Sequence, residues 1–169
     1  MNKRGSIEIS FGMIFSIIII IAIIGVAVYA ITTFMDFGNS ASIGLFYNDF
    51  QETVDEIWSS ATTNKIVSFS LPNSIEFVCF GSIANGINSL RYETQLKELR
   101  RSSSGFQQQT NNIFLYPSVK AKDLAFNKIN RIDLTSIENG FDCFEAKSGK
   151  VIIRLSKGEF QSLVKVEHE

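Results

Sequence analysis

The feature that most constrains this chain is a run of 27 residues, numbers 9 to 35, without a charged side chain. Within it, nine of the residues between Met13 and Ile31 are isoleucine. A membrane-spanning helix needs about 20 mostly apolar residues, and nine isoleucines contribute roughly −3 to −5 kcal/mol to insertion. A soluble core built from 169 residues could not surround such a helix on all sides. The sequence therefore predicts a transmembrane helix over residues 6–35.

The charges that flank this run predict its orientation. Lys3 and Arg4 precede it, and Asp36 is the first charged residue beyond it. Because basic residues are retained on the cytoplasmic side of a membrane, we expect a single pass, a cytoplasmic N-terminus and a C-terminal domain outside. The other interpretation is a cleaved secretory signal peptide, but its apolar core would be shorter, and Ala27 and Ala30 make a weak cleavage site.

The short segment before the apolar run is more specific about the class of protein than the run itself. The residues Lys3-Arg4-Gly5-Ser6-Ile7-Glu8 lead directly into the apolar segment. This arrangement resembles the leader of a type IV pilin, or of an archaeal pilin-like protein with a class III signal peptide. The resemblance implies that residues 1–5 are a basic leader and that a prepilin-type peptidase cuts between Gly5 and Ser6. It also implies that Glu8 takes part in assembly.

This short segment departs from both family patterns. In the bacterial pattern the acidic residue is the fifth after the cut, whereas Glu8 would be the third, and the archaeal pattern has Gln where this chain has Arg4. A partly desolvated carboxylate at Glu8 is best stabilised by an opposite charge, such as the N-terminal amine of a neighbouring subunit. The alternative places Glu8 among lipid headgroups, beside Lys3 and Arg4.

An amphipathic helix is predicted over residues 36–60. Its apolar side chains recur at helical spacing, at Ile43, Phe46, Phe50, Val54 and Ile57. A break between this helix and the apolar run could fall at Gly38-Asn39-Ser40. The polar side carries Asp49, Glu52 and Glu56. We interpret these three as a solvated acidic face, because a helix lacks the looped oxygen ligands that calcium prefers.

Residues 61–169 show the alternation typical of strands. Seven segments alternate, at 66–71, 75–80, 112–116, 129–134, 141–146, 151–155 and 162–166. Turn-forming residues at 72–74 and 148–149 join some of them directly. Closely spaced strands of this kind favour a mostly antiparallel sheet of about five to seven strands, with the amphipathic helix on one face. The predicted fold class is α+β: a long N-terminal membrane-spanning helix continues into an amphipathic helix that packs on the sheet.

One insertion, residues 85–111, interrupts the strand pattern. Its first part has the composition of a short basic helix and its second part is rich in Ser, Gln and Asn, so we expect it to be mobile. Lys97, Arg100 and Arg101 form a basic cluster that could face an acidic partner, lipid headgroups or a polysaccharide. The alternative is that these three residues are simply a solvated helix face.

The two cysteines, Cys79 and Cys143, both lie within predicted strands. They are too few and too far apart for a zinc site. In an extracytoplasmic domain an even pair favours a disulfide, which would close a loop of about 65 residues and stabilise the fold by roughly 4 kcal/mol. The alternative is two independent buried thiols.

Composition and missing motifs disfavour several function classes. With 16 basic and 17 acidic residues, a net charge of −1, the chain lacks the basic surface that nucleic acid requires. His168 is the one histidine, and no nucleotide-binding, metalloprotease or serine-hydrolase motif occurs. We therefore expect no metal, no cofactor and no enzymatic activity. An anchored enzyme that uses paired carboxylates is the remaining catalytic alternative.

These expectations combine into one functional hypothesis. The chain is expected to be a pilin-like or minor pilin-like subunit that is anchored by its N-terminal helix and assembles into a cell-surface filament or complex. Its expected partners are membrane lipid, like or related pilin subunits and a prepilin-type peptidase. The alternative is a single-pass membrane-anchored envelope protein whose outward β-domain binds a partner. Processing at Gly5 distinguishes the two.

Overall fold

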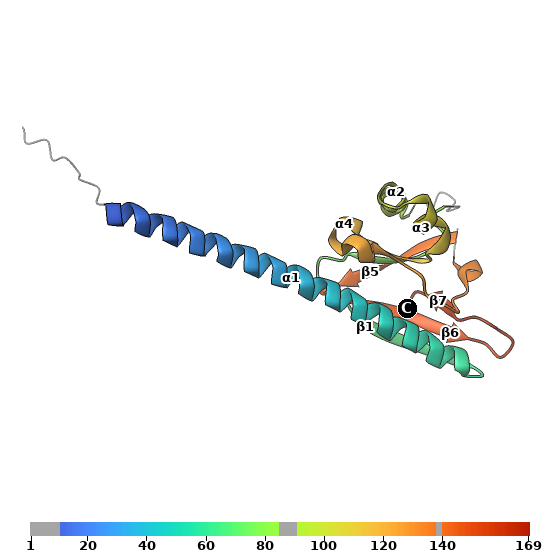
Figure 1. Cartoon of the computed structure of the whole chain (residues 1–169). Coiled ribbons are helices and arrows are strands. Elements are labelled where there is room, and N and C mark those ends of the chain that lie inside the picture. Colours follow the sequence, from blue (N-terminus) through green and yellow to red (C-terminus); the bar gives the residue numbers. More distant parts are fainter. Residues whose placement is uncertain (1–10, 85–90, 138–139) are drawn as a thin grey trace, which may run out of the picture. The chain divides into compact units, whose positions relative to one another are not determined.

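A single helix, α1 (Phe11–Ser59), accounts for the N-terminal third of the chain (Figure 1). The structure is a computed structural model that describes residues 11–84, 91–137 and 140–169. No proline interrupts α1, and the helix continues through Gly38-Asn39-Ser40, where a break was conceivable. The chain divides into two compact units at this point, one up to Gly38 and one from Asn39 onward.

The second unit contains a seven-stranded sheet. Its strands are β1 (Thr63–Ser70), β2 (Phe77–Gly81), β3 (Ile113–Tyr116), β4 (Phe126–Asn127), β5 (Phe141–Lys147), β6 (Lys150–Lys157) and β7 (Lys165–Glu167). Their order is β1-β6-β5-β2-β3-β4, and β7 also pairs with β6. Every pair of strands is antiparallel. The α+β class and the mostly antiparallel sheet are therefore confirmed.

Short helices complete this unit. They are α2 (Glu93–Ser102), α3 (Gly105–Thr110), α4 (Ser118–Ala121) and the 3-10 turns η1 (Lys122–Ala125) and η2 (Leu134–Ser136). Helices α2 and α3 lie in the predicted insertion, where Leu96 and Leu99 of α2 are buried. In α3 the side chain of Ser104 accepts from the backbone of Gln107 in a capping box. The mobility expected for this insertion remains a prediction.

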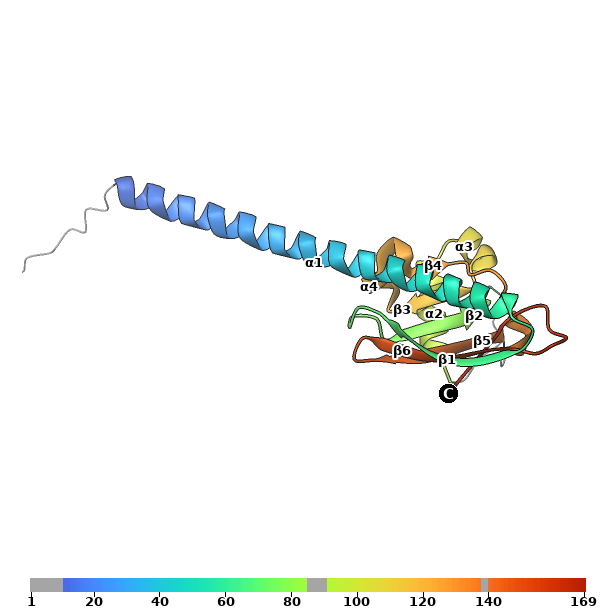
Figure 2. The same cartoon turned by 90° about the horizontal axis from the view of Figure 1, so that it is seen from below.

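Two apolar clusters hold the sheet between helices. The predicted stripe of α1 is buried, and it packs with inner-face residues such as Val78 and Phe80 of β2. Figure 2 shows this part of α1 lying along the sheet. The alternate residue Cys79 points to the other face, where Leu96 and Leu99 of α2 cover it. The predicted stripe is thus confirmed, and its spacing explains the burial, because residues three and four apart share one helix face.

Helix α2 covers only part of the face opposite α1. By alternation along the strands, the side chains that β1 and β6 direct away from α1 include Ile66, Ser68, Lys150, Ile152 and Arg154, and we call these five the outer sheet face. Ile66 and Ile152 are 49% and 45% exposed there. Isolated exposed apolar residues are ordinary, but two on neighbouring strands form a small apolar patch.

The strand predicted at residues 129–134 is wrong. A two-residue strand, β4, forms earlier, and Ile132 makes only an isolated bridge to Val164. The side chain of Asn112 takes the place of a neighbouring strand: its Nδ2 donates to the carbonyl of Ile129 (2.8 Å) and its Oδ1 accepts from the amide of Ile129 (2.7 Å). Arg131 then turns the backbone at a φ of 67°.

Candidate functional site

The first part of α1, residues 11–37, exposes its apolar side chains. Among them are Phe11, Phe15, Ile17, Ile18, Ile21, Ile24, Val26, Val28, Ile31, Phe34 and Phe37. Of the residues that the structure describes, α1 is the one helix long and apolar enough to cross a membrane. The length and composition required for the predicted transmembrane helix are therefore present.

The serine and threonine hydroxyl groups of this segment are hydrogen-bonded within the helix. Ser16 Oγ donates to the carbonyl of Gly12 (2.8 Å), and Thr32 and Thr33 each donate to the carbonyl of Tyr29 (2.9 Å). An unpaired polar group in hydrocarbon costs several kcal/mol, so such bonds back to the preceding turn suit a lipid environment.

The predicted processing and assembly residues, Gly5, Ser6 and Glu8, lie outside the described residues. Their roles remain predictions. The first residue of α1 that the structure describes, Phe11, follows them by three positions.

The second part of α1 is attached to the sheet unit by polar contacts as well as by its buried stripe. Residues 124–131, which we call the strap, run beside it. Tyr47 Oη donates to the carbonyl of Leu124 (2.7 Å), and Gln51 Oε1 accepts from the amide of Asn130 (2.8 Å). Burial raises the pKa of the Tyr47 hydroxyl far above its ordinary value of 10.0. This hydroxyl therefore stays protonated and acts as a donor.

The last turns of α1 continue the same line of contacts. Asp55 Oδ1 lies 2.9 Å from Arg131 Nη1, and the guanidinium of Arg131 covers the ring of Trp58. Trp58 Nε1 donates to the carbonyl of Ser162 (2.9 Å). Lys157 Nζ donates to the carbonyl of Trp58 (2.5 Å), placing a cation at the C-terminus of α1, where the helix dipole favours it.

The strap was not predicted from the sequence. One signal was present: Tyr47, Gln51 and Asp55 are each four residues apart and therefore share one helix face beside the apolar stripe. Nothing in the sequence indicated which segment that face contacts.

The predicted disulfide is present between Cys79 of β2 and Cys143 of β5. The two residues are direct partners across these antiparallel strands. The hydrogen bond from Ser82 N to Gly140 O (2.9 Å) marks these two residues as a hydrogen-bonded pair. Hydrogen-bonded and non-hydrogen-bonded pairs alternate along antiparallel strands, so Cys79 and Cys143, three positions further on, form a pair with no backbone hydrogen bond between them. Side chains approach most closely at such positions, which suits a bridge between neighbouring strands. Both cysteines are fully buried, which favours a structural role.

The predicted basic cluster on α2 is partly engaged within the fold. Lys97 Nζ lies 2.6 Å from the carboxylate of Glu93, and Arg100 Nε donates to the carbonyl of Ile83 (2.6 Å). Arg101 is exposed on the same helix. A partner-facing role for the cluster remains a prediction, and it would fall mainly on Lys97 and Arg101.

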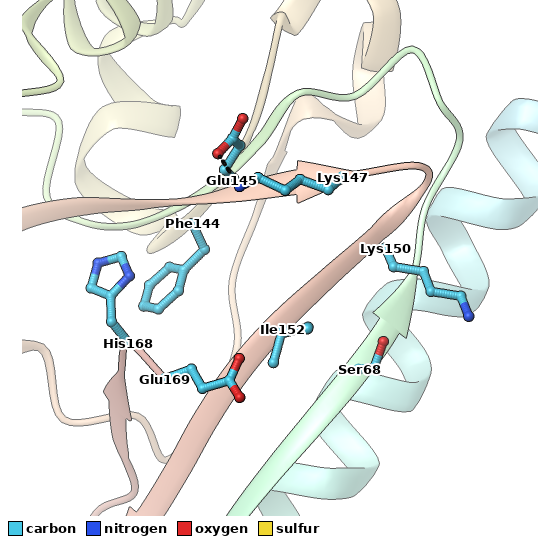
Figure 3. A pocket seen from close by; sticks show the side chains of 8 residues that line it. All are labelled: Ser68, Phe144, Glu145, Lys147, Lys150, Ile152, His168 and Glu169. Atoms are coloured by element: carbon cyan, nitrogen blue, oxygen red, sulfur yellow. Dashed lines mark ion pairs between the residues drawn. The ribbon is translucent and has the colours of Figure 1, made fainter.

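A hollow of about 430 Å³ lies on the outer sheet face between β5 and β6 (Figure 3). It forms because β5 and β7 share one edge of β6: β5 pairs with it near Val151 and β7 near Leu155. Where β5 diverges, His168 stacks on Phe144 with a centroid distance of 4.2 Å. Its Nε2 lies 2.8 Å from Asp142 Oδ2. His168 is therefore part of the wall of the hollow, a position that the sequence did not indicate.

Among the described residues, no group of three or more His, Cys, Asp or Glu side chains lies close enough to hold a metal ion. No protein-family model, curated protein or solved structure matches the chain.

Proposed function

We propose that the chain is a pilin-like or minor pilin-like subunit, anchored in a membrane by the first part of α1 and assembling with like subunits. The observation that carries the proposal is that the two parts of this one helix differ in the exposure of their apolar side chains. Residues 11–37 expose apolar side chains, whereas the second part buries its stripe in its own sheet unit. The exposed segment is thus available to lipid or to other helices.

The apolar segment suits an exchange between these two environments. In a membrane its side chains contact lipid, and in an assembly the same side chains contact neighbouring helices. Because lipid tails are as apolar as isoleucine, there is little hydrophobic gain in either direction. Packing and polar pairing must then favour assembly, and the carboxylate of Glu8 beside a neighbour's N-terminal amine would supply such a pair.

The sheet unit would lie outside the cytoplasmic membrane. The basic residues Lys3 and Arg4 support this orientation. A disulfide supports it independently, since disulfides persist in oxidising compartments. We propose a structural role for this unit in the assembly rather than catalysis.

The experiment that tests the proposal is the intact mass of the protein purified from its own membranes. Processing after Gly5 predicts a mass that lacks the first five residues. Gly5→Leu should remain uncut, because the peptidase needs a small side chain beside the bond. Gly25→Leu is the matched control, since the space around Gly25 is open and its leader is unchanged.

An uncut wild-type chain would refute the proposal and indicate a permanent single-pass anchor whose sheet unit binds a partner. Normal cutting of Gly5→Leu would remove the main support for prepilin-type processing. Purified filaments that contain the protein would extend the result from processing to assembly.

A further inference from the structure

Strand β1 forms an open edge of the sheet. It pairs with β6 on one side and with no strand on the other. The amide of Leu71, just beyond β1, donates to the carbonyl of Gly149, just before β6 (2.8 Å). Because hydrogen-bonded pairs alternate along antiparallel strands, the odd-numbered residues of β1 bond to β6 and the even-numbered ones direct their backbone groups away from the sheet. These outward residues, all of them exposed, are Asn64, Ile66, Ser68 and Ser70.

This edge lacks the features that usually protect an exposed strand. Strand β1 has eight residues and no proline, and its outward N–H and C=O groups have no hydrogen-bond partner among the described residues. Its one lysine, Lys65, is held by Glu56 of α1 at 3.0 Å. The strand at the opposite edge, β4, has only two residues. Unpaired backbone groups along an extended strand are a template for a further strand, so the chemistry of the edge fits an extended polypeptide.

The flank of α1 that runs along this edge is acidic. Glu56 bridges to Lys65 of β1, and a hollow of about 170 Å³ is lined by Leu45 and Asp49 of α1 and by the end of β1. Asp49, Glu52 and Glu56 share this side of the helix, and we call them the acidic flank. The carboxylates of Asp49 and Glu52 have no ion-pair partner among the described residues.

We infer that β1 pairs with an extended segment of a partner protein in which basic and apolar side chains alternate. Side chains of an added strand point alternately to the inner and outer sides of the sheet. On the inner side, lysine or arginine complements Asp49 and Glu52, and the stem of such a side chain packs in the hollow against Leu45. On the outer side, apolar side chains adjoin Ile66, which is 49% exposed. Backbone pairing gives affinity, and the alternating side chains give specificity.

A second copy of β1 fits this edge less well. Two antiparallel β1 strands related by a two-fold axis would place both acidic flanks on the same side of the joined sheet, facing each other across the contact. Like charges brought together in this way oppose association. In addition, the one basic residue of β1, Lys65, is already paired with Glu56. The inference goes beyond the proposed function, because the partner is a different protein and the pairing does not require processing at Gly5.

A synthetic peptide tests the pairing with the full chain in an uncharged detergent. The probe is a fluorescein-labelled peptide of about eight residues, a typical strand length, in which lysine and valine alternate. Fluorescence anisotropy measures its binding, and micelles without protein give the background. Two control peptides keep the same side chains: one groups the lysines before the valines, and the other has N-methylated backbone amides. We expect each control to bind at least tenfold more weakly, because the first loses the alternation and the second loses the backbone donors.

Variants of the chain locate the contact. Ser68→Pro removes an outward N–H and leaves the bonds to β6 intact, so it should weaken binding at least tenfold, whereas Ser68→Ala should bind like wild type. Asp49→Lys with Glu52→Lys should weaken binding as strongly. The matched control is Glu93→Lys with Asp123→Lys, on α2 and η1, which makes the same change in net charge and should leave binding unchanged.

The unfolding transition of each variant, followed by Trp58 fluorescence, shows whether it is folded. Absence of binding to wild type would overturn the inference, and so would binding that survives the charge reversal, the N-methylated backbone or a folded Ser68→Pro chain. Disulfide-linked dimers of Ile66→Cys that excess peptide does not prevent would assign the edge to a second copy instead. Intact mass is measured separately, so a chain cut after Gly5 that does not bind the peptide would refute the strand pairing alone.

Discussion

The guanidinium carbon of Arg131 lies 3.9 Å from the centre of the Trp58 ring, while a nitrogen of the same group lies 2.9 Å from Asp55. One side chain from the strap thus holds two residues of the last turns of α1. Because Trp58 is the one tryptophan of the chain, its fluorescence reports directly on this contact.

Replacing Arg131 with Gln should lower the free energy of unfolding by about 1–2 kcal/mol. A cation–π contact at an exposed site contributes about 0.5–1 kcal/mol and an exposed ion pair about 0.2–1 kcal/mol. Urea unfolding of the full chain in detergent, followed by Trp58 fluorescence, measures the loss. Asp55→Asn isolates the ion pair and should cost less. Equal stability of wild type and Arg131→Gln would show that the contact does not stabilise the docked helix.

Tyr47→Phe tests the buried end of the same line of contacts. It removes the hydroxyl that donates to the carbonyl of Leu124 and leaves that acceptor unpaired. A cost of about 1–3 kcal/mol is expected in the free energy of unfolding. Tyr29→Phe is the control, because Tyr29 is exposed in the apolar segment and should not affect unfolding of the sheet unit. A neutral Tyr47→Phe variant would mean that the carbonyl of Leu124 finds another donor.

The parts of the fold that sequence predicted are those with local periodicity. The apolar run, the stripe from Ile43 to Ile57 and most strands depend on spacings of 3.6 or two residues, which the chain displays directly. The disulfide was predicted from the expected extracytoplasmic compartment and from the even number of cysteines, since the paired cysteines are the only two present.

The parts that sequence did not predict depend on contacts between distant residues. Asn112 binds both backbone groups of Ile129, and a side-chain amide that substitutes for a strand has no periodic signature. Likewise, the position of His168 follows from the point at which β5 diverges from β6. The uncovered outer sheet face depends on the extent of α2 coverage, which only the tertiary structure defines.

A pH effect is expected at the N-terminus of η2. The hydroxyl of Thr135 donates to Asp133 Oδ1 (2.6 Å), and this bond holds the pKa of Asp133 below its ordinary value of 3.8. Because the folded chain binds this proton less readily than the unfolded chain, the ionised group stabilises the fold above pH 3.8. That stabilisation is lost as the pH falls through the pKa of the folded state.

Asp133→Asn should therefore have a lower Tm than wild type at neutral pH, and the difference should close below pH 3.8. Thermal unfolding between pH 2.5 and 7 measures it. Thr135→Val removes the hydroxyl donor and should show a weaker pH dependence at this site. A difference in Tm that stays constant over the whole range would assign the effect of Asp133→Asn to lost packing instead of lost charge.

The Cys79–Cys143 bridge should make the largest single contribution among these contacts. It links residues 64 positions apart, and on the chain-entropy model a loop of this size corresponds to about 4 kcal/mol. Replacing both cysteines with Ala should lower the free energy of unfolding by that order, measured by urea unfolding. Cys79→Ala alone should lower the free energy of unfolding by as much, and after unfolding it should also show one thiol available for labelling, at Cys143. Stoichiometric labelling of both cysteines in unfolded wild type without reductant would rule out the bridge.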